Sequence, residues 1–172
     1  MIRKFIFLNY LCLLFIFIFT IPFFETQAQE ISEQAEYIEP PKDLIIIDLL
    51  EGTGRIAENG KEIAVHYEGW LFDPTFEINN NNPDIESISQ NYCEAKGRPF
   101  DSSVKRGAPF SFFLGKGNVI VGWEKGVLGM QEDGKRCLII PPHLAYGNRS
   151  VGGGLIPANS TLIFEIILLG VR

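Results

Sequence analysis

Residues 62 to 72 follow a two-residue repeat of apolar and polar positions, and this repeat restricts the fold more than any other feature. The repeating positions on one side are Ile63, Val65, Tyr67, Gly69 and Leu71. Successive side chains of a strand point to opposite faces of a sheet. The repeat therefore predicts a half-buried strand with one face turned toward a core.

Four further segments have strand patterns, and one segment differs from them. The four are Leu44–Leu50, Pro109–Leu114, Lys135–Ile140 and Thr161–Leu169. Between them, residues 119–130 carry Ile120, Trp123 and Val127 at helical spacing. We expect Asn118 to cap this helix and Gly129 to end it. Strands around one short helix predict an α+β domain, in which a curved antiparallel sheet covers the helix.

This order of elements brings five aromatic side chains into the space between sheet and helix. They are Tyr67, Phe110, Phe112, Trp123 and Phe164. Such a cluster is most often packed core, and an apolar cavity with a few polar groups at its rim is the alternative. Asp101 and Tyr146 are the candidates for that rim, because each lies at a loop boundary.

The first 28 residues have the pattern of a targeting segment. Arg3 and Lys4 precede an almost wholly apolar run over residues 5–24, and the small residue Ala28 follows it. This order is typical of a cleaved signal peptide and favours an exported protein, either periplasmic or secreted. An uncleaved anchor that tethers the protein to a membrane is the alternative, because residues 5–24 just reach the roughly 20 residues of a membrane span.

Residues 29–43 are expected to form an acidic linker, followed by a single domain over residues 44–172.

Charge and composition exclude several classes of function. The whole chain has 15 Lys and Arg against 21 Asp and Glu, which argues against a broad nucleic-acid surface. Its two histidines and three cysteines are too few and too scattered for a zinc framework, and we expect no metal and no cofactor.

Residues 73–99 predict a surface insertion between two strands. They include Asn79–Asn82 and several acidic residues, with no clear apolar period. Folding over a pocket or binding a partner is the alternative.

Export would permit a disulfide between Cys93 and Cys137. However, Cys93 falls in this insertion and Cys137 in a strand pattern, so two unpaired thiols are our interpretation.

Ten short motifs then occur in a recognisable order. They are Val65-His66-Tyr67, Phe100-Asp101-Ser102-Ser103, Pro109-Phe110, Leu114-Gly115, Val119-Ile120, Gly122-Trp123-Glu124, Gly126, Ala145-Tyr146-Gly147, Ile156-Pro157 and Thr161-Leu162-Ile163-Phe164. Their order over residues 44–172 resembles that of FKBP-type peptidyl-prolyl cis-trans isomerases. The resemblance implies a half barrel of antiparallel strands wrapped on a short helix. It also implies rotation of X–Pro bonds in polypeptide clients, without a nucleophile.

The resemblance implies a role for each matched residue. Trp123 would lie under the proline ring, and Ile120 would offer a backbone N–H to a peptide carbonyl. Asp101 and Tyr146 would bond or polarise the substrate or a macrolide inhibitor such as rapamycin. The other expected wall residues are Tyr67, Phe100, Phe110, Val119, Ile156 and Phe164. Of all these, Tyr67, Asp101, Trp123, Tyr146 and Phe164 form the expected catalytic set.

Two features of the sequence bear on substrate choice and assembly. The loop over residues 148–155 contains Gly152-Gly153-Gly154 and is one residue longer than the minimal form of the family, which affects sequence preference. No long helical pattern precedes Leu44, so we expect a monomer and not a dimeric member of the family.

The alternative function is a proline-binding chaperone or adaptor of the envelope with incidental isomerase activity.

Overall fold

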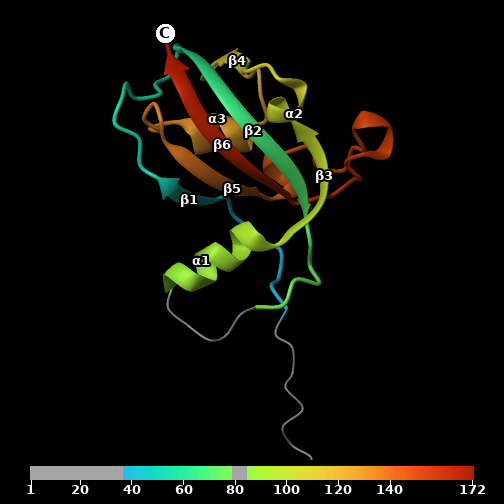
Figure 1. Cartoon of the computed structure of the whole chain (residues 1–172). Coiled ribbons are helices and arrows are strands. Elements are labelled where there is room, and N and C mark those ends of the chain that lie inside the picture. The colour runs from blue at the N-terminus through green and yellow to red at the C-terminus, as the bar shows by residue number, and fades with distance from the viewer. Residues whose placement is uncertain (1–36, 79–84) are drawn as a thin grey trace, which may run out of the picture. The chain divides into compact units, whose positions relative to one another are not determined.

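The computed structural model describes residues 37–78 and 85–172 (Figure 1). The predicted signal or anchor, and the linker up to residue 36, lie outside the described residues. The elements in chain order are β1 (Ile45–Leu50), β2 (Glu62–Phe72), α1 (Ile85–Glu94), β3 (Lys96–Ser102), α2 (Ser103–Arg106), β4 (Phe110–Phe113), α3 (Val121–Val127), β5 (Lys135–Ile140) and β6 (Leu162–Val171). Within these described ranges, no helix combines the length and apolar character needed to cross a bilayer.

All strand pairs are antiparallel, in the order β1-β5-β6-β2-β3, with β4 pairing with β2. The five predicted strands are present, with ends that differ by at most two residues. β2 and β6 are the long central pair, and their register places Tyr67 opposite Ile166 and Gly69 opposite Phe164. Ile63, Val65 and Tyr67 are buried, as the two-residue repeat predicts. The α+β fold class is confirmed.

The inner face of the sheet packs against α3, which lies behind the sheet in Figure 1. The helix is shorter than the expected 119–130, and the Asn118 cap was wrong. Ile120 occupies the N-cap position, and no side chain caps the helix. Close packing against β5 explains why the first turn of this helix contains a glycine, Gly122. A Cβ added to Gly122 would lie 2.4 Å from Cγ2 of the buried Ile140 on β5.

Replacing Gly122 with alanine is expected to destabilise the domain by about 1–3 kcal/mol, the usual cost of overpacking a dense core. Three side-chain atoms of Ile140 lie within 3.0 Å of the added methyl position, and a β-branched side chain has little freedom to move away. Urea unfolding measures the change. Gly170→Ala is the control, because the nearest atom to its added Cβ is 4.0 Å away. Equal stability of the two variants would contradict this packing.

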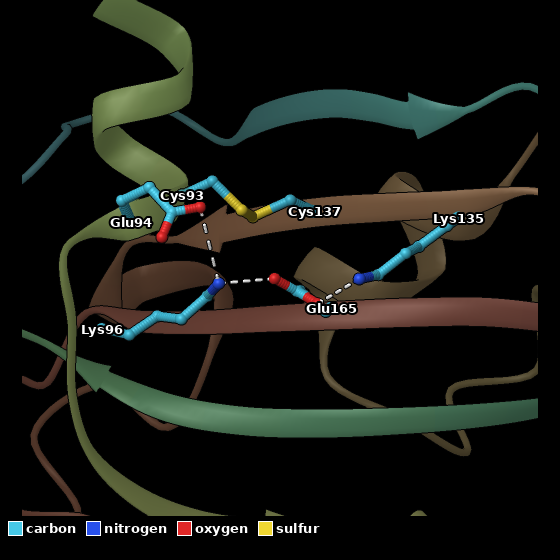
Figure 2. The surroundings of a disulfide bond; sticks show 6 residues. All are labelled: Cys93, Glu94, Lys96, Lys135, Cys137 and Glu165. Carbon is cyan, nitrogen blue, oxygen red and sulfur yellow. Dashed lines mark hydrogen bonds and ion pairs between the residues drawn. A yellow bond between two sulfur atoms is a disulfide. The ribbon is translucent and has the colours of Figure 1, made fainter.

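The outer face of the sheet carries a second hydrophobic cluster, to which the insertion contributes. Cys93 and Ala95, at the end of α1 and just beyond it, pack with Cys137 and Ile139 of β5 and Ile163 of β6. Cys93 and Cys137 form a disulfide with their Cα atoms 6.2 Å apart (Figure 2). The prediction of two unpaired thiols was therefore wrong. The described part of the insertion contains α1 and the first half of β3, and it packs on this outer face.

Four charged residues lie near the disulfide in Figure 2: Glu94, Lys96, Lys135 and Glu165. Glu165 of β6 accepts hydrogen bonds from Lys96 and Lys135, each at 2.5 Å. Burial of Glu165 favours its neutral form, but the hydrogen bonds from the two lysines outweigh this, so its pKa lies below the usual value. The carboxylate is thus ionised, and it links the start of β3 to the centre of the sheet.

Candidate active site

One cavity of about 440 Å³ opens on the inner face, between the sheet and the start of α3. β2, β3 and β6 contribute Tyr67, Asp101 and Phe164, while α3 and the segment before it contribute Trp123 and Ile120. The complete lining is Tyr67, Phe100, Asp101, Phe110, Gly117, Asn118, Val119, Ile120, Val121, Trp123, Ala145, Tyr146, Arg149 and Phe164. The cavity is therefore mainly apolar and aromatic, with few charged groups.

Trp123 lies at the centre of the aromatic residues. Its ring meets those of Tyr67 and Phe164 edge to face, with centroids 5.0 and 5.2 Å apart. Such pairs are favourable beyond the area they bury, and they restrict ring motion. Trp123 is only 4% exposed, and its indole N–H has no hydrogen-bond partner among the described residues. The floor of the cavity is therefore rigid and poorly solvated.

The opposite wall depends on a glycine. The rings of Phe100 and Phe164 meet edge to face at 5.5 Å, directly over Gly69 of β2. A Cβ at Gly69 would lie 2.8 Å from Cζ of Phe100 and 2.9 Å from Cε1 of Phe164. The absence of a side chain at this strand position therefore leaves room for both rings. The sequence repeat placed Gly69 on the correct face without revealing this reason.

The polar rim is a connected group of three side chains. The Tyr67 hydroxyl donates to Oδ2 of Asp101 at 2.5 Å and accepts from Nη2 of Arg106 at 2.8 Å. Arg106 also forms an ion pair with Asp101, and the Ser102 N–H donates to Oδ1 of Asp101 at 2.8 Å. Burial and the Asp101 hydrogen bond raise the pKa of Tyr67, so its phenol stays protonated and remains a donor at neutral pH.

Tyr146 completes the rim from the segment after β5. Burial, together with the negative charge of Asp101, raises the pKa of its phenol. The hydroxyl is therefore protonated at neutral pH, and it can donate a hydrogen bond to a bound carbonyl. Ile120 lies at the turn into α3, where its carbonyl accepts a hydrogen bond from the backbone N–H of Trp123 at 2.9 Å.

The structure brings together nine of the ten residues expected from the sequence. Ile156 does not line the cavity; it is 6% exposed and belongs to the main core. His66, on the opposite face of β2 from Tyr67, lies 3.0 Å from the Ser103 hydroxyl through its Nδ1. Arg106 and Arg149 were not among the residues predicted from the sequence. The one signal for Arg106 in the sequence is its position five residues after Asp101. One turn of helix α2 brings the Arg106 side chain back to the Asp101 carboxylate.

Comparison with known proteins shows what this chain is similar to in sequence and in fold. An FK506-binding protein of Streptomyces anulatus is 44% identical over 133 residues, which are 77% of this chain and 90% of that protein. An FK506-binding protein of Neisseria meningitidis serogroup A is 45% identical over 128 residues, which are 74% and 95% of the two chains.

Two crystal structures share the fold. AtFKBP13 superposes with a TM-score of 0.56 at 35% identity, over 80% of this chain and 99% of its own. FkpA from Escherichia coli gives a TM-score of 0.56 at 32% identity, over 86% of this chain and 55% of its own. The family profile of the FKBP-type peptidyl-prolyl cis-trans isomerases matches residues 53–169. This chain belongs to that family of enzymes.

Proposed function

We propose that the protein rotates X–Pro bonds in exported polypeptides by binding the proline in the aromatic cavity, without covalent catalysis. The observation that carries this proposal is the cavity itself, where Trp123 forms the floor and the Tyr67–Asp101–Arg106 group lies at one side. Resonance resists rotation of a peptide bond with a barrier of roughly 18–20 kcal/mol. For X–Pro bonds, uncatalysed exchange takes tens to hundreds of seconds.

The reaction requires only that the twisted amide bind better than the planar one. In the twisted amide the C–N bond loses its double-bond character and the carbonyl loses part of its dipole. A poorly solvated cavity therefore disfavours the polar planar form. The floor at Trp123 holds the proline ring while the flanking chain turns. Asp101 and Tyr146 interact electrostatically with the rotating group, and no proton transfer is needed.

The site of action that we propose is outside the cytoplasm, in the periplasm or as a secreted protein. The signal-like pattern of residues 1–28 supports this location, and so does the Cys93–Cys137 disulfide, because such bonds persist mainly in oxidising compartments. N-terminal sequencing of the exported protein tests the proposal. A start near Gln29 supports cleavage, whereas an intact N-terminus supports a membrane tether.

The partners that we propose are proline-containing clients and macrolides such as rapamycin. The monomer expected from the sequence remains part of this proposal. The described part of the insertion packs on the outer face and leaves the cavity open. This placement argues against folding of the described part of the insertion over the cavity.

Phe164→Tyr is expected to lower kcat/KM for a prolyl peptide several-fold. A hydroxyl would enter an apolar wall, where an unpaired polar group costs about 1–3 kcal/mol. Phe113→Tyr makes the same chemical change on a ring that is 51% exposed and does not line the cavity. Peptide isomerisation and thermal unfolding are measured for both variants. Equal kcat/KM in the two folded variants would argue against the cavity as the site of rotation.

A further inference from the structure

Among the described residues, Arg149 is the arginine that lines the cavity, and its charge has no partner. Arg98 and Arg172 also lack an ion pair within this part of the chain, but they do not line the cavity. Arg55 and Arg136 form ion pairs with Glu132 and Asp48, and Arg106 is paired with Asp101. Over residues 37–78 and 85–172, the Arg149 guanidinium makes no hydrogen bond or ion pair. It is exposed, and it lines the rim of the cavity.

The backbone beneath Arg149 is nevertheless held in place. Its N–H donates to the Tyr146 carbonyl at 3.3 Å, and just beyond it Val151 and Ile156 form an antiparallel bridge. Arg98 of β3 donates to the Leu155 carbonyl at 2.7 Å and joins this loop to the edge of the sheet. The guanidinium therefore extends from a supported loop, close enough to the Tyr146 phenol that its charge opposes the rise in that group's pKa.

The charges around the cavity leave a positive group available to a ligand. Among the residues that the structure describes, Asp101 is the only carboxylate that lines the cavity, and its charge is matched by Arg106. A guanidinium with free donors binds carboxylates through two parallel hydrogen bonds. The rim is thus locally cationic, although the whole chain has a formal charge of −6.

We infer that Arg149 makes the enzyme prefer proline sites with an acidic residue directly beside the proline. The inference rests on the proposed function, because it assigns a specificity to the same cavity. The client's carboxylate would pair with the guanidinium at the rim while the proline ring occupies the aromatic floor. The pair forms at an exposed position, so its effect is about two- to fivefold and weakens as salt is added.

The test compares isosteric peptides that differ only in charge. Isomerisation is measured for Glu-Pro against Gln-Pro and for Pro-Glu against Pro-Gln, at low and high ionic strength. For the wild-type enzyme we expect a Glu-to-Gln ratio of kcat/KM of about two to five in at least one series, falling with salt. Arg149→Gln removes the preference, Arg149→Glu reverses it, and Arg149→Lys restores part of it.

Lys61→Gln is the matched control, since it removes one exposed positive charge away from the cavity. This control retains the wild-type ratio if the effect is local, and a fall as large as that of Arg149→Gln would overturn the inference. The inference would also be overturned if the wild-type enzyme isomerised the Gln peptides but gave a Glu-to-Gln ratio of one in both series. Failure to accelerate any of the four peptides would instead overturn the proposed function.

Discussion

Asp101→Val is expected to lower kcat/KM for a Leu-Pro peptide by about 10- to 100-fold while the domain stays folded. A hydrogen bond to a charged group contributes about 1.5–3 kcal/mol, and each 1.36 kcal/mol of lost transition-state stabilisation is a factor of ten in rate. Valine also leaves the Tyr67 hydroxyl and Arg106 without their carboxylate partner. The rim would then lose both its negative charge and its fixed geometry.

Asp48→Val provides a close control for this substitution. Like Asp101, Asp48 lies on an edge strand and pairs with an arginine, here Arg136. The side-chain exposures are similar, at 44% for Asp48 and 39% for Asp101. Asp48 belongs to β1, at the other edge of the sheet, so its loss should leave kcat/KM near the wild-type value. The role of Asp101 would be contradicted if both variants lost activity equally, or if neither variant lost activity.

Removing the disulfide with Cys93→Ala and Cys137→Ala is expected to lower the free energy of unfolding by about 2–4 kcal/mol. The bond joins residues 44 apart in sequence, and it limits the freedom of the unfolded chain. It also holds α1 against β5, where Cys137 is fully buried. Urea unfolding of the double variant, and of the wild-type protein in a reducing buffer, measures the effect.

The isomerase activity of this double variant should be unchanged well below its unfolding temperature. Cys137 and Ile139 point to the outer face, whereas Leu138 and Ile140 pack in the core that supports the cavity. The alternation along β5 therefore separates the disulfide from the site. A large fall in kcat/KM with little change in stability would contradict this separation.

The sheet and the aromatic cluster were predictable because their signals are local. The repeat on β2 gave the buried face directly, since strand periodicity is a property of neighbouring residues. Trp123 and Phe164 followed from the helix and strand patterns in the same way. The edge position of Asp101 was not visible, because strand β3 breaks the repeat with Gly97 and Pro99 and pairs with β2 through irregular register.

The missed features depend on contacts between distant parts of the chain. Helix α1 and the disulfide are stabilised by the outer face of the sheet, and the insertion alone carries only a weak apolar pattern. The contact between Gly122 and Ile140 spans two elements and is likewise invisible in the sequence. Ile156 was placed at the cavity by family resemblance, whereas its bridge to Val151 turns it into the core.

The most direct test of the central claim is isomerisation of Leu-Pro and Phe-Pro peptides by the chain from Gln29 onward, with and without rapamycin. We expect acceleration that rapamycin abolishes at a one-to-one ratio with the protein, because both ligands would occupy the cavity above Trp123. A folded sample that accelerates neither peptide would contradict the account, as would acceleration that saturating rapamycin leaves unchanged.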